Sequence, residues 1–184
     1  IFFKNHKIVN DSVGNYGYID RKGNVINEED VKDIEAEYKD GLSLFTINRY
    51  KPDRKIGYKD KDGNIVIEAI FTSGAEFSEG LASVSMENRN VYIDSTGNTV
   101  IECRFLLCSS FNEGLAAVYI NDIDKWGFID RKGKTIIKPQ FANVHSFSEG
   151  VAIVQVFDNP ISNREGMYGV IDKKGNFIIS AKYA

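Results

Sequence analysis

The sequence predicts an all-β protein built from tandem repeat units, because two short phrases recur along its 184 residues. The first phrase is an aromatic or aliphatic residue, a glycine, and then a turn of the form Asp-x-x-Gly. The second is an aromatic residue followed by a polar residue, Glu and Gly. The glycine position of the first phrase returns every 34–42 residues, at Gly17, Gly57, Val91, Gly127 and Gly169. A period of this size indicates that one small unit is stacked repeatedly.

The first phrase predicts a β-hairpin, which its fourth copy shows most fully. Residues 126–129 are aromatic or β-branched apart from Gly127, and residues 135–137 are again β-branched. Such residues are enriched in strands. Between them, Asp130 and Gly133 fit the first and fourth positions of a type I turn, where Asp accepts hydrogen bonds from turn amides and Gly adopts a positive φ. We therefore expect a hairpin in every unit.

The second phrase predicts a third strand that starts at its glycine. This glycine lies 23 residues after the first-phrase position in the second, third and fourth units, and 24 residues after it in the first unit. The variable lengths fall after the third strand, as expected for a surface loop. Residues 28–37 are the one candidate for a short helix. The domain prediction is a single repeat array over residues 1–184, part of a longer protein, with units near 16–44, 56–84, 91–118, 126–154 and 168–184.

Two architectures fit such units. In an open twisted array, three-stranded units (a hairpin plus one strand) bury their apolar faces against their neighbours. In the alternative, a closed β-propeller-like ring, residues 1–3 complete the fifth unit, which lacks a second phrase. Three strands per unit and unequal periods favour the open array, which is the fold prediction.

Apolar residues at fixed distances from the turn glycines form the predicted core, and burial of each contributes roughly 1.5–3 kcal/mol. They belong to four series, two of isoleucine and two mainly of phenylalanine: Ile19, Ile93, Ile129, Ile171; Ile67, Ile101, Ile137, Ile179; Phe71, Phe105, Phe141, Tyr183; Phe77, Phe111, Phe147.

The fourth unit resembles the WG repeat, also called the KWG repeat, of bacterial proteins. It contains Lys125-Trp126-Gly127 before the turn, Lys138-Pro139-Gln140-Phe141 after it, and the second phrase at residues 147–150. The other copies depart from this pattern at the tryptophan position, which is occupied by Tyr16, Ile56, Asn90 and Tyr168, and at the glycine position of the third unit, which is Val91. The resemblance covers essentially the whole chain. It implies a bacterial β-repeat protein that serves as a binding or scaffold module, and it implies no shared activity, cofactor or catalytic residue.

Composition narrows the class of partner. The net charge is −3 at pH 7, whereas nucleic-acid-binding domains are usually basic, so we expect no nucleic-acid partner. We expect no membrane insertion, because no stretch reaches the ~18–20 apolar residues that a span needs. The start of the chain does not resemble a signal peptide. Because the chain begins with Ile1 rather than Met, the sequence is compatible with a leader that has been removed, and both the cytoplasm and the cell surface stay open as compartments.

Cysteine and histidine offer little chemistry. Cys103 and Cys108 occur in the third unit only, and we expect them to be buried as small hydrophobic residues, with a disulfide as the alternative. Two free thiols fit a reducing compartment. A zinc site needs about four clustered ligands, which the sequence does not offer. His6 and His145 do not recur in the repeat, and the Gly-x-Ser-x-Gly elbow of a serine hydrolase is absent near His145. We therefore predict no metal, no catalytic residue and no enzyme.

One aspartate per unit stands at the start of the hairpin turn, at Asp20, Asp60, Asp94, Asp130 and Asp172. A row of carboxylates is compatible with acid–base or metal chemistry, but its position predicts capping of the turn amides instead. The segment 60–64 has the alternating acids of a calcium loop. Such a loop also needs a glutamate six residues after Gly63, where Ala69 stands. No cofactor is predicted.

Two surface rows are candidates for binding. Basic residues at the turn tips would form a line that meets phosphate or sulfate, although ordinary solvated turn residues are the favoured interpretation: Arg21, Lys22, Lys61, Arg131, Lys132, Lys173 and Lys174. An exposed aromatic row would stack on sugars or peptides, but alternating strand positions require one of its two sets to face the core: Tyr16, Trp126 and Tyr168, or Tyr18, Tyr58, Tyr92 and Phe128.

The predicted function is a non-enzymatic binding or scaffold module that recognises a protein partner along the repeat surface. The alternative is a module that binds cell-envelope glycans, which requires Trp and Tyr exposed on one face. An enzyme is the third hypothesis and requires a cleft with paired carboxylates or a histidine partner. The ligand-binding residues are unknown at this level.

Overall fold

The computed structural model describes residues 38–47, 52–86, 89–157 and 166–183, and before them the backbone of four short strands. It divides into two compact units, Ile1–Tyr38 and Lys39–Ala184. The first unit contains one antiparallel sheet whose strands follow chain order: β1 (Phe2–Phe3), β2 (His6–Asn10), β3 (Tyr16–Ile19) and β4 (Val25–Ile26). The helix expected at 28–37 lies outside the described residues.

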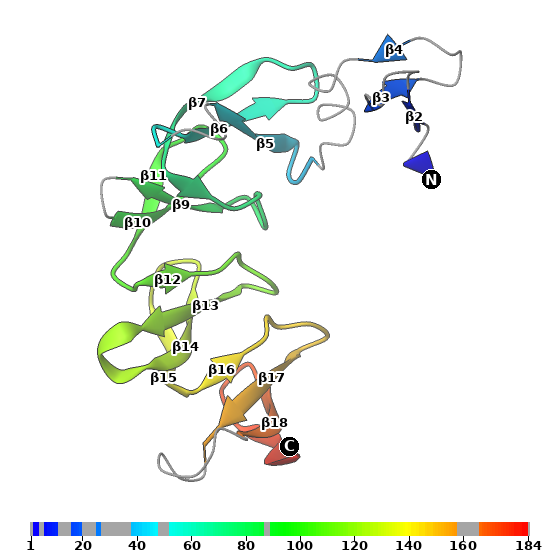
Figure 1. The fold of residues 1–184 in the computed structure, drawn as a ribbon. Coiled ribbons are helices and arrows are strands. Elements are labelled where there is room, and N and C mark those ends of the chain that lie inside the picture. Colours follow the sequence, from blue (N-terminus) through cyan, green and yellow to red (C-terminus); the bar gives the residue numbers. More distant parts are fainter. Residues whose placement is uncertain are drawn as a thin grey trace. The chain divides into compact units, whose positions relative to one another are not determined.

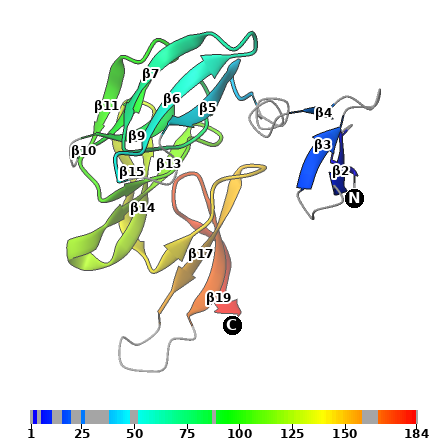
Figure 2. The ribbon, with the colours of Figure 1, turned by 45° about the horizontal axis from the view of Figure 1, so that its top comes forward.

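The second unit contains four antiparallel sheets that follow one another along the chain (Figures 1 and 2). Sheet 1 has β5 (Leu42–Ile47), β6 (Lys55–Asp60) and β7 (Ile65–Phe71). Sheet 2 has β8 (Ser73–Gly74), β9 (Ala82–Met86), β10 (Arg89–Ile93) and β11 (Thr99–Cys103). Sheet 3 has β12 (Leu107–Cys108), β13 (Leu115–Ile120), β14 (Lys125–Asp130) and β15 (Thr135–Phe141). Sheet 4 has β16 (Asn143–Val144), β17 (Val151–Val156), β18 (Met167–Asp172) and β19 (Phe177–Tyr183).

The all-β prediction and the open tandem arrangement are confirmed. None of the described sheets closes into a barrel. A ring would need the N-terminal strand in the last sheet, but β1 pairs with β2, and sheet 4 consists of β16 to β19. The helical content of the second unit, over the residues described, is the single 3-10 turn η1 (Asn121–Ile123). No helix in the described part of the chain has the length and hydrophobicity needed to cross a membrane.

Each sheet takes its strands from two successive sequence units. In sheet 2, β9 ends one unit and pairs with β10 of the next, so that Val84 lies opposite Val91. The reason is the short connection between β9 and β10, since short loops favour antiparallel neighbours. The three expected strands are present in every sheet of the second unit. Sheets 2, 3 and 4 add a short strand at one edge, which the sequence did not indicate.

The hairpin turns have the predicted chemistry. In sheet 3, Asp130 Oδ1 accepts the amides of Lys132 and Lys134, each at 2.9 Å, and Gly133 has a φ of +78°. Asp60, Asp94 and Asp172 accept the equivalent amides in their own turns. Hydrogen bonds from Asn64, Thr96 and Asn176 lower the pKa of these three carboxyls. Turn capping is confirmed for these four aspartates, and Asp20 lies outside the described residues.

The second phrase forms a two-residue turn with both central residues at positive φ. At its second copy, Glu79 has a φ of +56° and Gly80 a φ of +78°, while Ser78 and Leu81 exchange backbone hydrogen bonds. This is the backbone of a type I′ turn, which matches the twist of the strands it joins. The same turn recurs at Asp40-Gly41, Glu113-Gly114 and Glu149-Gly150.

Successive sheets contact each other through both turns. A Cβ atom placed on the hairpin glycine of one sheet would meet an isoleucine of the preceding sheet: Gly97 at 3.3 Å from Ile67, Gly133 at 2.8 Å from Ile101 and Gly175 at 3.1 Å from Ile137. The glycine amide of each Glu-Gly turn donates to the acid of the preceding one: Gly80 to Asp40 at 2.7 Å, Gly114 to Glu79 at 3.0 Å and Gly150 to Glu113 at 2.9 Å. The Glu-Gly phrase is therefore both a turn and a link between repeats.

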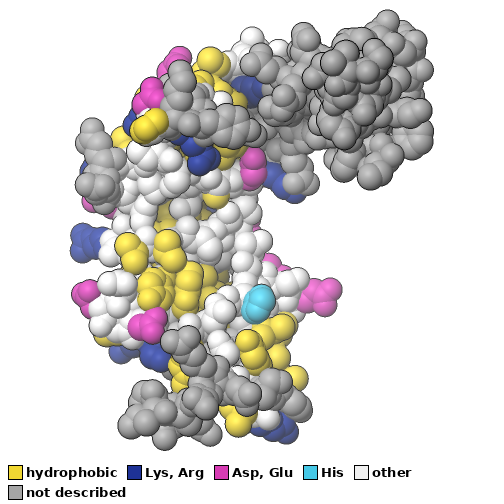
Figure 3. All heavy atoms as spheres, in the orientation of Figure 1, with side chains coloured by type: hydrophobic (Ala, Val, Ile, Leu, Met, Phe, Trp, Pro, Cys, Tyr) yellow, Lys and Arg dark blue, Asp and Glu magenta, His cyan; other side chains and the backbone are white. Residues whose placement is uncertain are grey.

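The predicted core is largely confirmed. The buried members are Ile93, Ile129, Ile171, Ile67, Ile101, Ile137, Phe71, Phe141, Phe77, Phe111 and Phe147. Two predictions are wrong: Phe105 is only half-buried, and Ile179 is 43% exposed because no described hairpin turn covers it. The side chains of Ile19 and Tyr183 lie outside the described residues. On one face of the second unit, hydrophobic side chains remain visible over β12 and β13 (Figure 3).

Candidate binding groove in the third repeat

The glycine of the first phrase permits a bulge in the neighbouring strand. A Cβ atom on Gly127 would lie 2.5 Å from the Ile137 carbonyl oxygen and 2.7 Å from the Pro139 nitrogen. Pairing jumps from Trp126 with Phe141 to Phe128 with Ile137, so β15 contains extra residues at this point. Gly57 and Gly169 face the same kind of irregularity. Only glycine allows so close an approach of two backbones.

The third repeat has Val91 at this position, and the bulge is missing there. Asn90, Val91 and Tyr92 pair with Cys103, Glu102 and Ile101 in regular register. Because the valine side chain occupies the space of the bulge, β11 ends at Cys103 and the chain leaves the sheet. Phe105 is thereby kept out of the deep core position that Phe71 and Phe141 occupy at 1% exposure. The departure from the repeat opens a groove.

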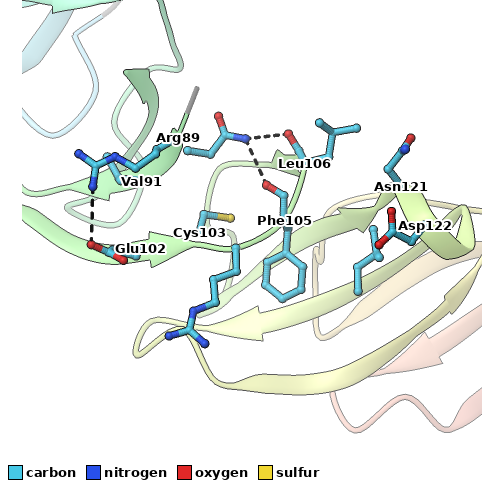
Figure 4. Close-up of a pocket in the computed structure, with 11 residues that line it drawn as sticks. Arg89, Val91, Glu102, Cys103, Phe105, Leu106, Asn121 and Asp122 are labelled. Carbon is cyan, nitrogen blue, oxygen red and sulfur yellow. Dashed lines mark hydrogen bonds and ion pairs between the residues drawn. The ribbon is translucent and has the colours of Figure 1, made fainter. Parts of the chain in front are cut away.

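The groove has a volume of about 540 Å³ and lies where sheets 2 and 3 meet. Its walls come from β10, from β11 and the loop at 104–106, and from the end of β13 with η1. Figure 4 shows the Phe105 ring between Glu102 at one end and Asp122 at the other. The groove therefore keeps these two carboxylates apart.

Asn90 holds the loop that forms the groove. Its Nδ2 donates to the carbonyls of Leu106 at 2.7 Å and Phe105 at 3.2 Å (Figure 4). Its Oδ1 accepts the Ser85 hydroxyl at 2.6 Å, and Ser85 Oγ in turn accepts from Ser73 Oγ at 2.8 Å. Asn90 and Leu106 also line a second hollow of about 210 Å³. One asparagine at the tryptophan position of the repeat thus organises both hollows.

A disulfide closes the loop from the other side. Cys103 at the end of β11 is bonded to Cys108 on β12, so the prediction of two free thiols is wrong and the alternative holds. Cys103 is buried, as predicted, at 8% exposure. The bond and the Asn90 hydrogen bonds together limit the conformations of residues 104–107.

The groove is amphipathic. Arg89 and Glu102 form an ion pair at 3.9 Å with side chains 59% and 70% exposed, which in water contributes little to stability. Leu106, at 53% exposure, is an apolar wall residue. Leu107 and Ile123, at 50% and 53% exposure, extend this apolar surface along the chain beyond the groove. Such a surface suits an extended segment with apolar and charged groups.

The predicted catalytic and metal candidates lie elsewhere. His145 is exposed beyond β16, and its backbone amide donates to Ile153; the His6 side chain is outside the described residues. Asp60 Oδ1 is occupied by the amides of its own turn, as in the other repeats. Across the described residues, no group of three or more His, Cys, Asp or Glu side chains is placed to hold a metal ion.

The turn-tip bases serve the contacts between repeats. Lys173 Nζ lies 3.0 Å from Glu113 Oε2, and its hydrogen bond is the main cause that lowers the pKa of Glu113. The Arg131 guanidinium lies 3.7 Å from the position of a Cβ on Gly80. These two bases face Glu-Gly turns, which favours the structural interpretation of the basic line.

The aromatic row divides between core and surface. Tyr58, Tyr92 and Phe128 are completely buried. Trp126 is half-buried with its ring centroid 5.2 Å from that of Tyr119, and Tyr168 is 37% exposed. The side chains of Tyr16 and Tyr18 lie outside the described residues. The set that faces the core is therefore the one that contains Tyr58, Tyr92 and Phe128.

Sequence reasoning missed the groove, although its signals are visible. Val91 replaces the repeat glycine, Asn90 replaces the tryptophan, and both cysteines fall in this unit alone. Val91 and the cysteine pair are special to this repeat, whereas the tryptophan position varies in other repeats as well, and together they mark the place where the regular bulge is lost.

Comparison with known proteins agrees with the repeat geometry. A family model of the WG containing repeat matches residues 56–89, 92–122, 126–159 and 168–184. No curated protein matches the sequence. A crystal structure of a protein of unknown function from Bacteroides caccae is similar at 12% identity and a TM-score of 0.35, over 89% of this chain and 73% of that one. Because the family model covers more than half of the residues, this chain belongs to the WG-containing repeat family.

Proposed function

We propose that the second unit is a non-enzymatic binding module that takes a protein partner at the groove of the third repeat. The observation that carries this proposal is the set of exposed aliphatic side chains at the groove and beside it, namely Leu106, Leu107 and Ile123. Apolar surface rimmed by charged groups is typical of protein interaction sites. Arg89, Glu102 and Asp122 provide such charges.

A protein partner is favoured over a glycan by the kind of apolar group exposed. Sugar rings stack on flat aromatic faces, whereas the exposed large apolar groups here are the branched aliphatic side chains, and the one aromatic ring that lines the groove, Phe105, is half-buried. The enzyme hypothesis has less support, because Glu102 and Asp122 lie at opposite ends of the groove (Figure 4) and His145 is outside it. The glycan hypothesis stays as the second outcome of the test.

The test is a pull-down with the immobilised chain against soluble protein, membrane and purified cell-wall fractions. Leu106→Asp, in the groove wall, should weaken capture of a defined protein roughly tenfold or more, and Ile123→Asp, beside the groove, should weaken it by a smaller factor. Ile153→Asp is the matched control, because Ile153 is similarly exposed, at 46%, but lies on β17.

Equal loss with the control variant would contradict the groove as the site. Retention on cell wall that is competed by soluble glycan would replace the protein hypothesis by the glycan hypothesis. Circular dichroism of each variant checks that the fold is retained.

A further inference from the structure

The loop that forms the groove has left its sheet with part of its backbone unpaired. In β7 the residue that corresponds to Phe105 is Phe71, which still pairs with Ile56 on the neighbouring strand. β11 instead ends at Cys103, so Arg104 and Phe105 belong to no strand. Among the described residues, the backbone amides of these two residues have no hydrogen-bond acceptor. Both residues line the groove, which therefore offers free backbone donors to a ligand.

The charged side chains of the groove are only partly matched with one another. Arg89 and Glu102 form an ion pair. Arg104, which follows the end of β11, is exposed and has no carboxylate partner among the described residues. Asp122, on η1 across the groove, is also exposed, and no described side chain pairs with it. One positive and one negative group, carried by opposite walls, are thus left for a ligand to match.

The apolar part of the groove completes this arrangement. The Phe105 ring lies between Glu102 and Asp122 (Figure 4), and Leu106 beside it is exposed. An aliphatic side chain of a ligand would cover both residues and remove apolar surface from water, which favours binding. The unmatched charges would add selectivity, because complementary charges determine the choice of partner and its register more than the affinity.

The size of the groove limits the kind of ligand. Its volume of about 540 Å³ is in the range that encloses a drug-sized molecule. The groove therefore accommodates a few residues of one chain segment and not the face of a folded domain. Free backbone donors favour a segment in extended conformation, because such a segment presents its carbonyl groups for pairing.

We propose that the groove binds an extended segment of the partner with a defined order of charges, an inference that rests on the proposed function. An acidic residue of the segment lies opposite Arg104, an aliphatic residue packs on Phe105 and Leu106, and a basic residue lies opposite Asp122. The backbone of the segment accepts hydrogen bonds from the two free amides. The order of charges sets the direction of the segment, because exchanged charges would place like charges together.

Selection of phage-displayed random peptides on the immobilised chain tests this proposal. We expect the enriched peptides to share an acidic and a basic residue, in one fixed order, on either side of an aliphatic residue. Fluorescence anisotropy with a labelled synthetic copy of an enriched peptide then measures the affinity. A peptide with the two charges exchanged should bind at least about tenfold more weakly, as expected for like charges brought together.

Charge exchange on the protein identifies the two walls separately. Arg104→Glu should weaken binding of the enriched peptide at least about tenfold, and a lysine in place of its acidic residue should recover most of the loss. Asp122→Lys should have the same effect, with recovery when a glutamate replaces the basic residue of the peptide. Lys174→Glu is the matched control, because Lys174 is exposed at the hairpin turn of sheet 4, and it should leave the affinity unchanged.

Two results would overturn the extended segment as the ligand: a selection that enriches no peptide, and enriched peptides whose binding ignores either charge exchange. Neither result decides the proposed function, which depends on whether Leu106→Asp weakens capture of a partner in the pull-down. A partner captured through Leu106 without any enriched peptide would show that the groove binds a folded surface. Circular dichroism of each variant checks that the fold is retained.

Discussion

The hairpin glycine serves two purposes at one residue. Gly133 adopts a positive φ that ends its turn, and it also leaves room for Ile101 of the preceding sheet. Gly63 shares the first purpose, with a φ of +85°, but its surroundings are open. A comparison of substitutions at these two glycines therefore distinguishes the cost of backbone strain, which both share, from the cost of lost packing between repeats, which applies to Gly133 alone.

We predict that Gly133→Ala destabilises the protein more than Gly63→Ala does. The left-handed conformation alone costs a non-glycine residue about 1–2 kcal/mol. At Gly133 the added methyl would also overlap Ile101, and overpacking typically costs a further ~1–3 kcal/mol. Urea unfolding of both variants measures the difference. Equal losses would show that the stacking contact does not constrain this turn.

Two buried tyrosines make stability sensitive to alkali. The hydroxyls of Tyr58 and Tyr92 donate to the carbonyls of Ala75 at 2.7 Å and Ser109 at 2.6 Å, and burial raises the pKa of both phenols well above the ordinary value. Their folded pKa exceeds the unfolded pKa of about 10, so the stability they contribute is complete below pH 10 and is lost as the pH rises above it.

We predict that Tyr92→Phe reduces the fall of stability between pH 9 and pH 11. At neutral pH the variant should be less stable by about 1 kcal/mol, the net contribution of one hydrogen bond. Chemical unfolding across this pH range measures both effects. A pH dependence identical to that of the unmodified chain would contradict the assignment of Tyr92 as a buried titrating group.

At the scale of elements, the third repeat lacks the regular bulge and has in its place a loop that is held by a disulfide and by hydrogen bonds. Val91 removes the bulge from β11, and the Cys103–Cys108 bond with the Asn90 hydrogen bonds holds the chain that leaves the strand. The groove exists because these elements no longer pack as they do in the neighbouring repeats.

We predict that loss of the disulfide destabilises the protein by roughly 2 kcal/mol, the loop-entropy value for so short a loop. Thermal unfolding of the chain with and without reductant gives the measurement. The double variant Cys103→Ser with Cys108→Ser is the control, because reductant should not affect it. An unchanged melting temperature in the reduced chain would contradict a stabilising bond.

The acid ladder between Glu-Gly turns also links elements. The hydrogen bond from Lys173 and that from the Gly150 amide lower the pKa of Glu113 below its ordinary value of 4.5. A lowered folded pKa means that the stabilisation is present above pH 4.5 and is lost as the pH falls through the folded pKa.

We predict that Glu113→Gln lowers stability at pH 7 and that this difference disappears at acidic pH. Urea midpoints at pH 7 and pH 3 check the prediction. Glu149→Gln is the matched control in dilute protein, because the Glu149 carboxylate has no partner among the described residues. The same pH-dependent loss in both variants would show that general acid effects, not the ladder, are responsible.

At the scale of the whole molecule, the sheets of the second unit are linked to their neighbours in sequence. Stability in such arrays is approximately the sum of the repeats and the contacts between adjacent ones. Sheet 3 has described neighbours on both sides, whereas the isoleucine position of sheet 4 is exposed.

We predict that amides of β19 exchange with solvent faster than the equivalent amides of β15. A strand covered on one side opens at lower free energy than one enclosed by two sheets. Hydrogen exchange of the dilute chain, followed by NMR or mass spectrometry, compares the two strands. Equal protection would indicate that the second unit opens as one cooperative body.

Much of this fold is predictable because its decisive interactions are local. The Asp130–Gly133 turn is decided within five residues, and the aromatic and β-branched residues Phe128 and Ile129 mark the strand before it. The spacing of the apolar residues also predicts most of the core, since residues at the same position of different repeats, such as Ile67 and Ile137, have the same buried environment. The groove was not predictable in this way, because the effect of Val91 depends on whether the neighbouring strand of the sheet bulges opposite it.

The sequence by itself determined the all-β class, the repeat period, the turn chemistry and most of the buried residues, since these follow from residue type and short spacing. Only the tertiary structure decided which strands share a sheet, where the repeat rule breaks to form the groove, and which isoleucine stays exposed. The physical reason is that these outcomes depend on the neighbour. A glycine permits a bulge only if a strand approaches it, and Ile179 differs from Ile137 only in what lies against it.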